Sequence, residues 1–131
     1  MIYLDSCALL KLAHAEAESD ALRTWLVSQR EDEVLVSSSL AEVETTRALR
    51  RGDPASLERL PTFFSSFDFF EIDRGIRQRA AAYPDPGLRS LDAIHLATAE
   101  ELRTDLLAFV TYDKRLASAA SGIGLPVVAP S

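Results

Sequence analysis

The chain has 131 residues, of which 47% are hydrophobic and 26% charged, proportions typical of one compact globular domain. Its net charge of −6 argues against a protein that holds nucleic acid by surface potential alone, unless a bound cation or a basic partner reverses the local field. The single cysteine, Cys7, excludes an internal disulfide, and no apolar run reaches the ~20 residues of a membrane span. We therefore expect one cytoplasmic domain over residues 1–131, without membrane association.

Short apolar runs alternate with segments of helical periodicity along the whole chain. In chain order the pattern predicts a strand over 2–4, helices over 6–12 and 18–30, a strand over 34–36, a helix from the serines at 37–39 to 51, a helix from Pro54 capped by Asp53, a strand over 69–72, helices over 74–82 and 90–103, a strand over 107–111, a helix after 113 and a strand over 126–128. Strands separated by helices imply right-handed crossovers. The expected fold class is therefore α/β, a three-layer α/β/α sandwich with a mostly parallel central sheet.

Acidic residues that follow strands are the first candidates for function, because open sheets of this class bind ligands beyond the carboxyl ends of their strands. Asp5 directly follows the first strand, and Asp113 lies two residues past the fourth. Each also suits a helix N-cap, a role that stabilises a helix by about 1 kcal/mol. A cap uses one carboxylate oxygen, so the other oxygen remains free for a metal ion.

Asp92 lies in the first turn of the most apolar predicted helix. The helix dipole favours an acid at this position. A carboxylate beside a buried helix nevertheless calls for a cation or for hydrogen-bond donors, so a structural and a functional reading are both open.

The helix after the second strand contains two glutamates, Glu42 and Glu44. They cannot both face one site, because residues two apart lie about 200° apart around a helix. Counting about 100° per residue from Leu40 places Glu44 amid the apolar face, between Leu40 and Ala48, and Glu42 nearly opposite. We expect Glu44 to be the functional acid and Glu42 to be a solvated surface residue.

Four carboxylates at one edge of a sheet favour a hard cation with oxygen ligands, Mg²⁺ or alternatively Mn²⁺. The chain has no Cys and His cluster at zinc spacing, no P-loop, no GxGxxG fingerprint and no GxSxG elbow. A zinc site, a nucleotide hydrolase and a serine hydrolase therefore lack support.

Four stretches in order, and a closing strand, carry a resemblance to a known family. They are Ile2-Tyr3-Leu4-Asp5-Ser6, residues 38–49 from Ser38-Ser39-Leu40 through Glu44-Thr45-Thr46-Arg47, Leu91-Asp92-Ala93-Ile94-His95-Leu96-Ala97, Val110-Thr111-Tyr112-Asp113-Lys114-Arg115-Leu116, and Gly124-Leu125-Pro126-Val127-Val128. With these the chain resembles PIN-domain proteins and, within them, the VapC toxins of bacterial toxin–antitoxin pairs. The resemblance implies an α/β/α sandwich, Mg²⁺-dependent endoribonuclease activity, a homodimer and inhibition by a VapB-like antitoxin.

Carried over position by position, the resemblance implies that the catalytic and metal-binding acids are Asp5, Glu44, Asp92 and Asp113. Ser6 and Thr111 match supporting positions near the metal. Basic residues that follow or precede these acids would contact flanking RNA phosphates if they are not simply solvated: Arg89, Lys114 and Arg115.

A catalytically silent PIN-like module that binds RNA or regulates is the alternative function, and it is less favoured because none of the four acids is missing. A second alternative, a phospho-acceptor signalling domain, would need a pair of acidic residues at the end of the first strand. Asp5 is the only acid there, so this alternative lacks support. We expect structural roles for Cys7 as a small buried hydrophobic residue and for His95 as a packed core histidine. The five phenylalanines between 63 and 70 are expected in the core or in a partner groove.

Overall fold

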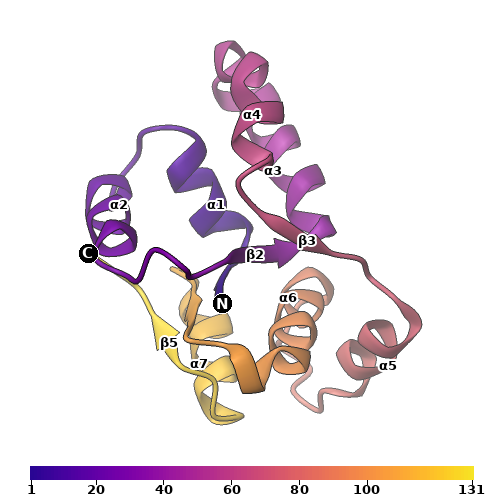
Figure 1. Cartoon of the computed structure of the whole chain (residues 1–131). Coiled ribbons are helices and arrows are strands. Elements are labelled where there is room, and N and C mark those ends of the chain that lie inside the picture. Colours follow the sequence, from indigo (N-terminus) through magenta and orange to yellow (C-terminus); the bar gives the residue numbers. More distant parts are fainter.

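Five strands pair in the order β3-β2-β1-β4-β5, and every pair is parallel. We describe them from a computed structural model of the whole chain, residues 1–131 (Figure 1). The strands are β1 (Ile2–Leu4), β2 (Leu35–Ser38), β3 (Asp68–Phe70), β4 (Ala108–Val110) and β5 (Val127–Val128). The predicted mostly parallel sheet is thus confirmed, and β1 lies at its centre.

Seven helices cover the two faces of the sheet. They are α1 (Ser6–Ala13), α2 (Ser19–Val27), α3 (Ser39–Gly52), α4 (Leu60–Phe64), α5 (Arg74–Ala82), α6 (Ser90–Glu101) and α7 (Lys114–Gly122), with short 3-10 helices over Pro54–Arg59 and Arg103–Asp105. Figure 1 shows α1 to α4 on one side of the sheet and α5 to α7 on the other. None of these helices combines the length and the apolar character that crossing a bilayer requires.

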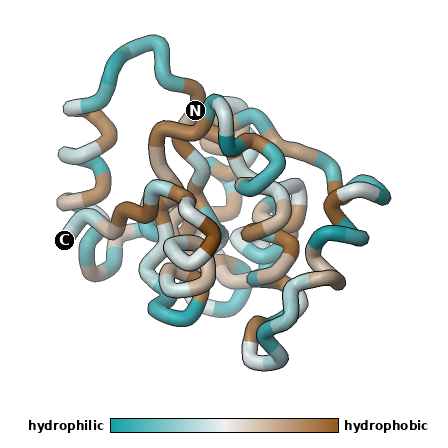
Figure 2. The backbone as a smooth tube through the Cα atoms, turned by 90° about the horizontal axis from the view of Figure 1, so that it is seen from below, coloured by the Kyte–Doolittle hydropathy of each residue, from teal (hydrophilic) through white to brown (hydrophobic).

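The central strand is buried on both faces because each face has its own hydrophobic core. Ile2 and Leu4 pack into a cluster shared with α1, α2 and α3, whereas Tyr3 packs into a cluster shared with α6 and α7. Alternate side chains of a strand point to opposite faces, so three consecutive apolar residues serve two cores. Figure 2 shows the hydrophobic segments gathered toward the middle of the fold and the hydrophilic ones at its periphery.

Aspartate caps determine where three of the helices begin. The Oδ1 atoms of Asp5, Asp73 and Asp113 each accept a hydrogen bond of 2.9 Å from a backbone N–H in the first turn of α1, α5 and α7. The predicted starts of these helices are confirmed, because a cap satisfies an amide that the helix itself leaves unpaired.

Two local predictions were wrong. Asp53 does not cap a helix: its carboxylate accepts from Ser56 Oγ at 2.5 Å, and Pro54–Arg59 is a 3-10 helix rather than the start of an α-helix. Cys7 is exposed rather than buried, because Ala8 and Leu9, and not Cys7, form the buried face of α1.

The buried face of α3 also differs from the one that the helical spacing placed around Leu40 and Val43. Val43 is 61% exposed, and the buried residues of α3 are Ala41, Thr45 and Leu49. Glu44 therefore lies beside the buried stripe rather than within it. Of the phenylalanines, Phe67 is buried in the core, and its neighbours pack against the core from partly buried positions.

Candidate active site

The four predicted acids come from elements that meet at the carboxyl edge of the sheet. Asp5 follows the central strand β1, and Asp113 follows the adjacent strand β4 and precedes α7. Glu44 lies in α3, which follows the other neighbouring strand, β2. Asp92 lies in the first turn of α6. We call these four residues the acidic site.

The charges of the acidic site act on one another and on Cys7, which shows that the four side chains share one region. The pKa of the Cys7 thiol is raised to about 11, first by partial desolvation and then by the negative charges of all four acids. A thiol with this pKa is protonated at neutral pH and is a poor nucleophile.

Asp5 is the most buried acid, with 3% of its surface exposed. Its Oδ2 accepts a hydrogen bond of 2.6 Å from Thr111 Oγ1, while its Oδ1 caps α1. Burial raises the pKa of Asp5, and the Thr111 bond only partly offsets this. Thr111 is itself fully buried and accepts from the backbone N–H of Asp113 at 3.1 Å. The residue therefore links the acids that follow β1 and β4.

Glu44 is held by two side chains from other elements. Its Oε1 accepts hydrogen bonds from Ser6 Oγ and from His95 Nε2, the latter at 3.0 Å. Desolvation alone would raise the pKa of Glu44, but these two hydrogen bonds outweigh it, and the pKa is lowered. Glu44 is therefore ionised at neutral pH. The side chain of Glu42, by contrast, makes no hydrogen bond or ion pair.

His95 is buried as predicted, with 2% of its surface exposed, but it is not merely packed. Its Nδ1 lies 2.7 Å from Tyr3 Oη, and its Nε2 lies 2.9 Å from Ser6 Oγ and 3.0 Å from Glu44 Oε1. The sequence offered one signal for this arrangement, a histidine within an otherwise apolar helix three residues after Asp92. It gave no indication that the partner would be Glu44.

Asp92 makes no hydrogen bond or ion pair with protein groups. Its pKa is raised, first by desolvation and then by the charge of Asp113. The second carboxylate oxygens of Glu44 and Asp113 also lack protein partners. The site therefore presents carboxylate oxygens whose mutual repulsion is not compensated by protein cations.

No three His, Cys, Asp or Glu side chains are arranged in this structure so that they would hold a metal ion. The chemistry of the acidic site nevertheless fits a hard divalent cation, because such ions take carboxylate oxygens and retain several waters of their own. A bound cation would provide a partner for the free oxygens of Glu44, Asp92 and Asp113. It would also lower the raised pKa values of Asp5 and Asp92.

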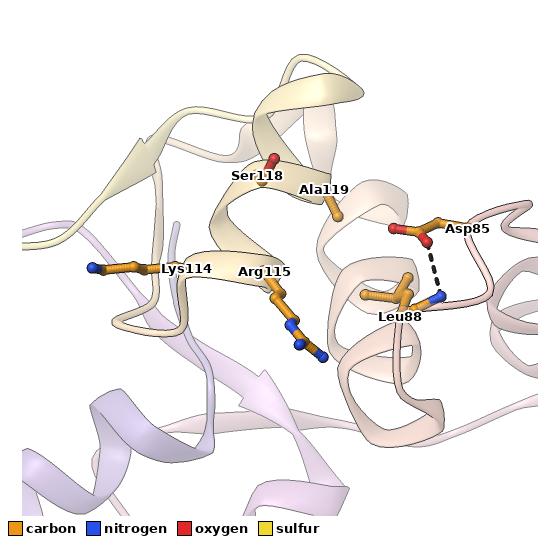
Figure 3. A pocket seen from close by; sticks show the side chains of 7 residues that line it. Asp85, Leu88, Lys114, Arg115, Ser118 and Ala119 are labelled. Atoms are coloured by element: carbon orange, nitrogen blue, oxygen red, sulfur yellow. Dashed lines mark hydrogen bonds between the residues drawn. The ribbon is translucent and has the colours of Figure 1, made fainter.

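A pocket of about 660 Å³ lies beside Asp113, between α7 and the loop before α6 (Figure 3). Its lining residues are Asp85, Gly87, Leu88, Lys114, Arg115, Ser118 and Ala119. In Figure 3 Arg115 extends toward the side of Leu88, whereas Lys114 points the opposite way. Neither of these cations, nor the exposed Arg89 at the start of α6, forms an ion pair. They are free to bind an anion next to the acidic site.

A second groove of about 440 Å³ adjoins Glu44 on the other side, between α1 and α3. Its walls include the exposed apolar residues Val43 and Leu91 and the cations Arg47 and Arg51. The groove therefore places apolar side chains and two cations beside Glu44.

Comparison with known proteins gives consistent matches over nearly the full length of the chain. The PIN domain family model matches residues 2–122. Ribonuclease VapC35 of Mycobacterium tuberculosis is 52% identical over 132 residues, which cover 99% of this chain and 97% of that protein. Ribonuclease VapC46 of the same species is 42% identical over 130 residues, covering 99% and 98%.

Solved structures match the fold at lower sequence identity. A toxin–antitoxin complex from Klebsiella pneumoniae superposes with a TM-score of 0.75 at 20% identity, covering 100% of this chain and 98% of that one. VapC20 of Mycobacterium tuberculosis, described as a toxin that cleaves the sarcin–ricin loop, superposes with a TM-score of 0.74 at 16% identity, covering 99% and 100%.

Proposed function

This chain belongs to the PIN-domain family and to its VapC-type ribonuclease toxins, and we propose that it hydrolyses RNA phosphodiester bonds at the acidic site with the help of Mg²⁺ or Mn²⁺. The observation that carries the proposal is the meeting of Asp5, Glu44, Asp92 and Asp113 at one edge of the sheet, with unsatisfied carboxylate oxygens among them. The ribonuclease names of relatives that are 42% and 52% identical support the reaction class.

In the proposed mechanism the four carboxylates hold the cation directly or through water. Thr111 keeps Asp5 in place through its 2.6 Å hydrogen bond, and Ser6 and His95 do the same for Glu44. Asp92 and Asp113 keep oxygens free to complete the site. The cation supplies Lewis-acid chemistry, since it neutralises charge that develops on the phosphodiester and helps to activate water for attack.

We propose that RNA is positioned by the cations around the pocket beside Asp113. Arg115 and Arg89 lie next to the acidic site without carboxylate partners, so they suit the phosphates on either side of the bond that is cut. The protein as a whole carries a net charge of −6. RNA should therefore bind weakly unless the divalent cation is also present.

We further propose a cognate VapB-like antitoxin as partner and the cytoplasm as location. The structural neighbour from Klebsiella pneumoniae is a toxin–antitoxin complex. The groove lined by Val43 and Leu91 offers an apolar surface that leads to Glu44, so a segment bound there would block the acidic site. A homodimer, which the family resemblance implies, stays a prediction.

The test is cleavage of a panel of structured RNAs by the purified protein, in Mg²⁺ or Mn²⁺ and in EDTA. We expect cutting only with the cation. The variants Asp5→Asn, Asp92→Asn and Glu44→Gln should each lose about 100-fold or more in kcat/KM, as is usual when charge stabilisation of the transition state is removed. Glu42→Gln is the matched control and should cut like the unmodified protein. Arg115→Ala should raise KM and leave kcat nearly unchanged, because it removes binding that ground and transition states share.

Cutting that persists in EDTA would remove the cation from the mechanism, and undiminished cutting by Asp92→Asn would remove Asp92 from the site. A folded protein, free of antitoxin, that binds RNA but cuts none of it would establish the alternative, a catalytically silent RNA-binding module.

A further inference from the structure

We propose that Tyr3 and His95 form a buried positioning pair that orients the Glu44 carboxylate. Tyr3 fixes the imidazole of His95 in the tautomer that carries its hydrogen on Nε2, and that hydrogen is donated toward Glu44 and Ser6. The functional meaning of the pair rests on the proposed function, because Glu44 is a proposed cation ligand, but the hydrogen-bond chain itself does not depend on it.

Tyr3, the first residue of this hydrogen-bond chain, is held rigidly. It is fully buried on the central strand, and its ring stacks on Phe109 with centroids 5.3 Å apart and an interplanar angle of 15°. Its ring also meets His95 edge-on, at 5.9 Å and 79°. Both aromatic contacts aim the Tyr3 hydroxyl at Nδ1, which lies 2.7 Å away.

The direction of this first hydrogen bond follows from the groups around the Tyr3 hydroxyl. A tyrosine phenol keeps its hydrogen at neutral pH, and this one is fully buried. The one hydrogen bond of that hydroxyl is the 2.7 Å contact with His95 Nδ1; the Ser37 and Thr98 hydroxyls also lie near it, and each donates its own hydrogen to a backbone carbonyl. If Nδ1 carried a hydrogen of its own, the Tyr3 hydrogen would have to turn to Ser37 or Thr98, with which Tyr3 makes no hydrogen bond in this structure. Tyr3 therefore donates and Nδ1 accepts.

The hydrogen-bond partners of His95 Nε2 independently indicate the same tautomer. Ser6 has one hydroxyl hydrogen, and it is donated to Glu44 Oε1. Ser6 Oγ can therefore only accept from His95 Nε2, which lies 2.9 Å away. Glu44 Oε1, at 3.0 Å from the same nitrogen, is also an acceptor. Nε2 faces two acceptors and no donor, so it must carry the hydrogen.

The pair gives Glu44 a fixed orientation that its own helix does not provide. The glutamate side chain is 27% exposed and lies beside the buried stripe of α3. A glutamate in such a position samples several rotamers unless other groups hold it. Outer hydrogen bonds to metal-binding residues commonly change metal affinity by about 10-fold to 100-fold, and we expect an effect of that size here.

The first test reads the tautomer directly. The chain contains only two histidines, so a long-range ¹⁵N–¹H correlation spectrum of the imidazoles is simple, and His14→Asn assigns the remaining signals to His95. We expect a protonated Nε2 and an unprotonated Nδ1 near neutral pH. Two protonated nitrogens, or a protonated Nδ1 alone, would overturn the proposal.

The second test measures consequences in the Tyr3→Phe variant, which keeps the aromatic ring and removes only the hydroxyl. Mn²⁺ affinity, measured by calorimetry, should fall about 10-fold to 100-fold, and the preference for the Nε2 tautomer should weaken. Any loss of RNA cleavage should be reduced by raising the Mn²⁺ concentration. Tyr83→Phe is the matched control: it removes a tyrosine hydroxyl that donates to Glu100 Oε1 at 3.0 Å, outside the acidic site, and it should leave the His95 spectrum and the Mn²⁺ affinity unchanged.

An unchanged Mn²⁺ affinity in Tyr3→Phe would refute the positioning role even if the tautomer is as expected. The expected tautomer and Mn²⁺ effect in a protein that cuts no RNA would instead refute the proposed nuclease and leave the positioning pair intact.

Discussion

The pKa of each acid depends on how far hydrogen-bond donors around its carboxylate offset the desolvation that burial causes. Asp5 and Glu44 are both desolvated, yet their pKa values shift in opposite directions. Thr111 only partly offsets the desolvation of Asp5, whereas His95 and Ser6 more than offset that of Glu44. Asp92 has no donor at all, and its pKa is raised. Two acids therefore carry charge that the folded protein disfavours in the absence of a cation.

These shifts predict how stability depends on pH when divalent ions are removed. A carboxyl group whose pKa is higher in the folded state binds protons more tightly there, so its folded state is favoured as the pH falls through the folded pKa. We expect the free energy of unfolding in EDTA to rise as the pH falls from 7 toward the ordinary aspartate pKa of about 4. Glu44, with its lowered pKa, acts in the opposite direction only near and below that range.

Asp92→Asn removes part of this effect. At pH 7 the variant should be more stable than the unmodified protein by on the order of 0.5 kcal/mol, a modest value because the side chain is partly exposed and screened by solvent. Its stability should also change less between pH 7 and pH 5. Urea unfolding at the two pH values measures both, with Glu42→Gln as the control. A stability that drops on acidification over this range would contradict the assignment.

At the scale of the helix, Asp5 and Asp113 each serve as a cap and as a member of the acidic site. Asp113 caps α7 with the same 2.9 Å geometry by which Asp73 caps α5. Only Asp113 belongs to the acidic site, so the two residues separate the structural role of a cap from the proposed catalytic role.

We expect Asp113→Ala to lower the free energy of unfolding by about 1 kcal/mol, and Asp113→Asn to leave it nearly unchanged, because Asn caps as well as Asp. RNA cleavage should be lost in both. Asp73→Ala should lose the same stability while it keeps full cleavage. Denaturant unfolding and cleavage assays on the three variants check this, and full activity in Asp113→Asn would show that the residue is only a cap.

Considered as a whole, the molecule concentrates negative charge at one edge of its sheet and places free cations on both sides of it. Arg47 and Arg51 line the groove next to Glu44, and Lys114 and Arg115 line the pocket next to Asp113. A divalent cation bound at the acidic site would join these basic flanks into one surface that suits a polyanion.

Such a cation should also stabilise the whole fold, because it binds the folded chain and not the unfolded one. At a Mn²⁺ concentration 100 times the dissociation constant, the expected gain is about 2.7 kcal/mol. Thermal unfolding across a Mn²⁺ titration measures it. The gain should vanish in Asp92→Asn and persist in Glu42→Gln; equal gains in both variants would mean that the ion binds elsewhere.

Local pattern in the sequence was sufficient to predict those features of this protein that depend on neighbouring residues. Alternating apolar runs and helical segments predicted the α/β/α sandwich, and cap residues predicted where α1, α5 and α7 begin. Because parallel strands end at the same edge of a sheet, the positions of Asp5 and Asp113 after β1 and β4 are sufficient to predict both acids at that edge.

The side chains that meet at the acidic site depend on the packing of distant segments, which local pattern does not specify. Thr111 and Asp5 are 106 residues apart, and His95 and Glu44 are 51 apart, distances over which spacing carries no information. The helical count favoured Glu44 but placed the apolar face of α3 around Val43, which is exposed, because the buried face of a helix depends on which neighbours pack against it. The strand order, the exposure of Cys7 and the partners of His95 have the same origin: periodicity specifies a face, and the packing of distant segments determines what that face contacts.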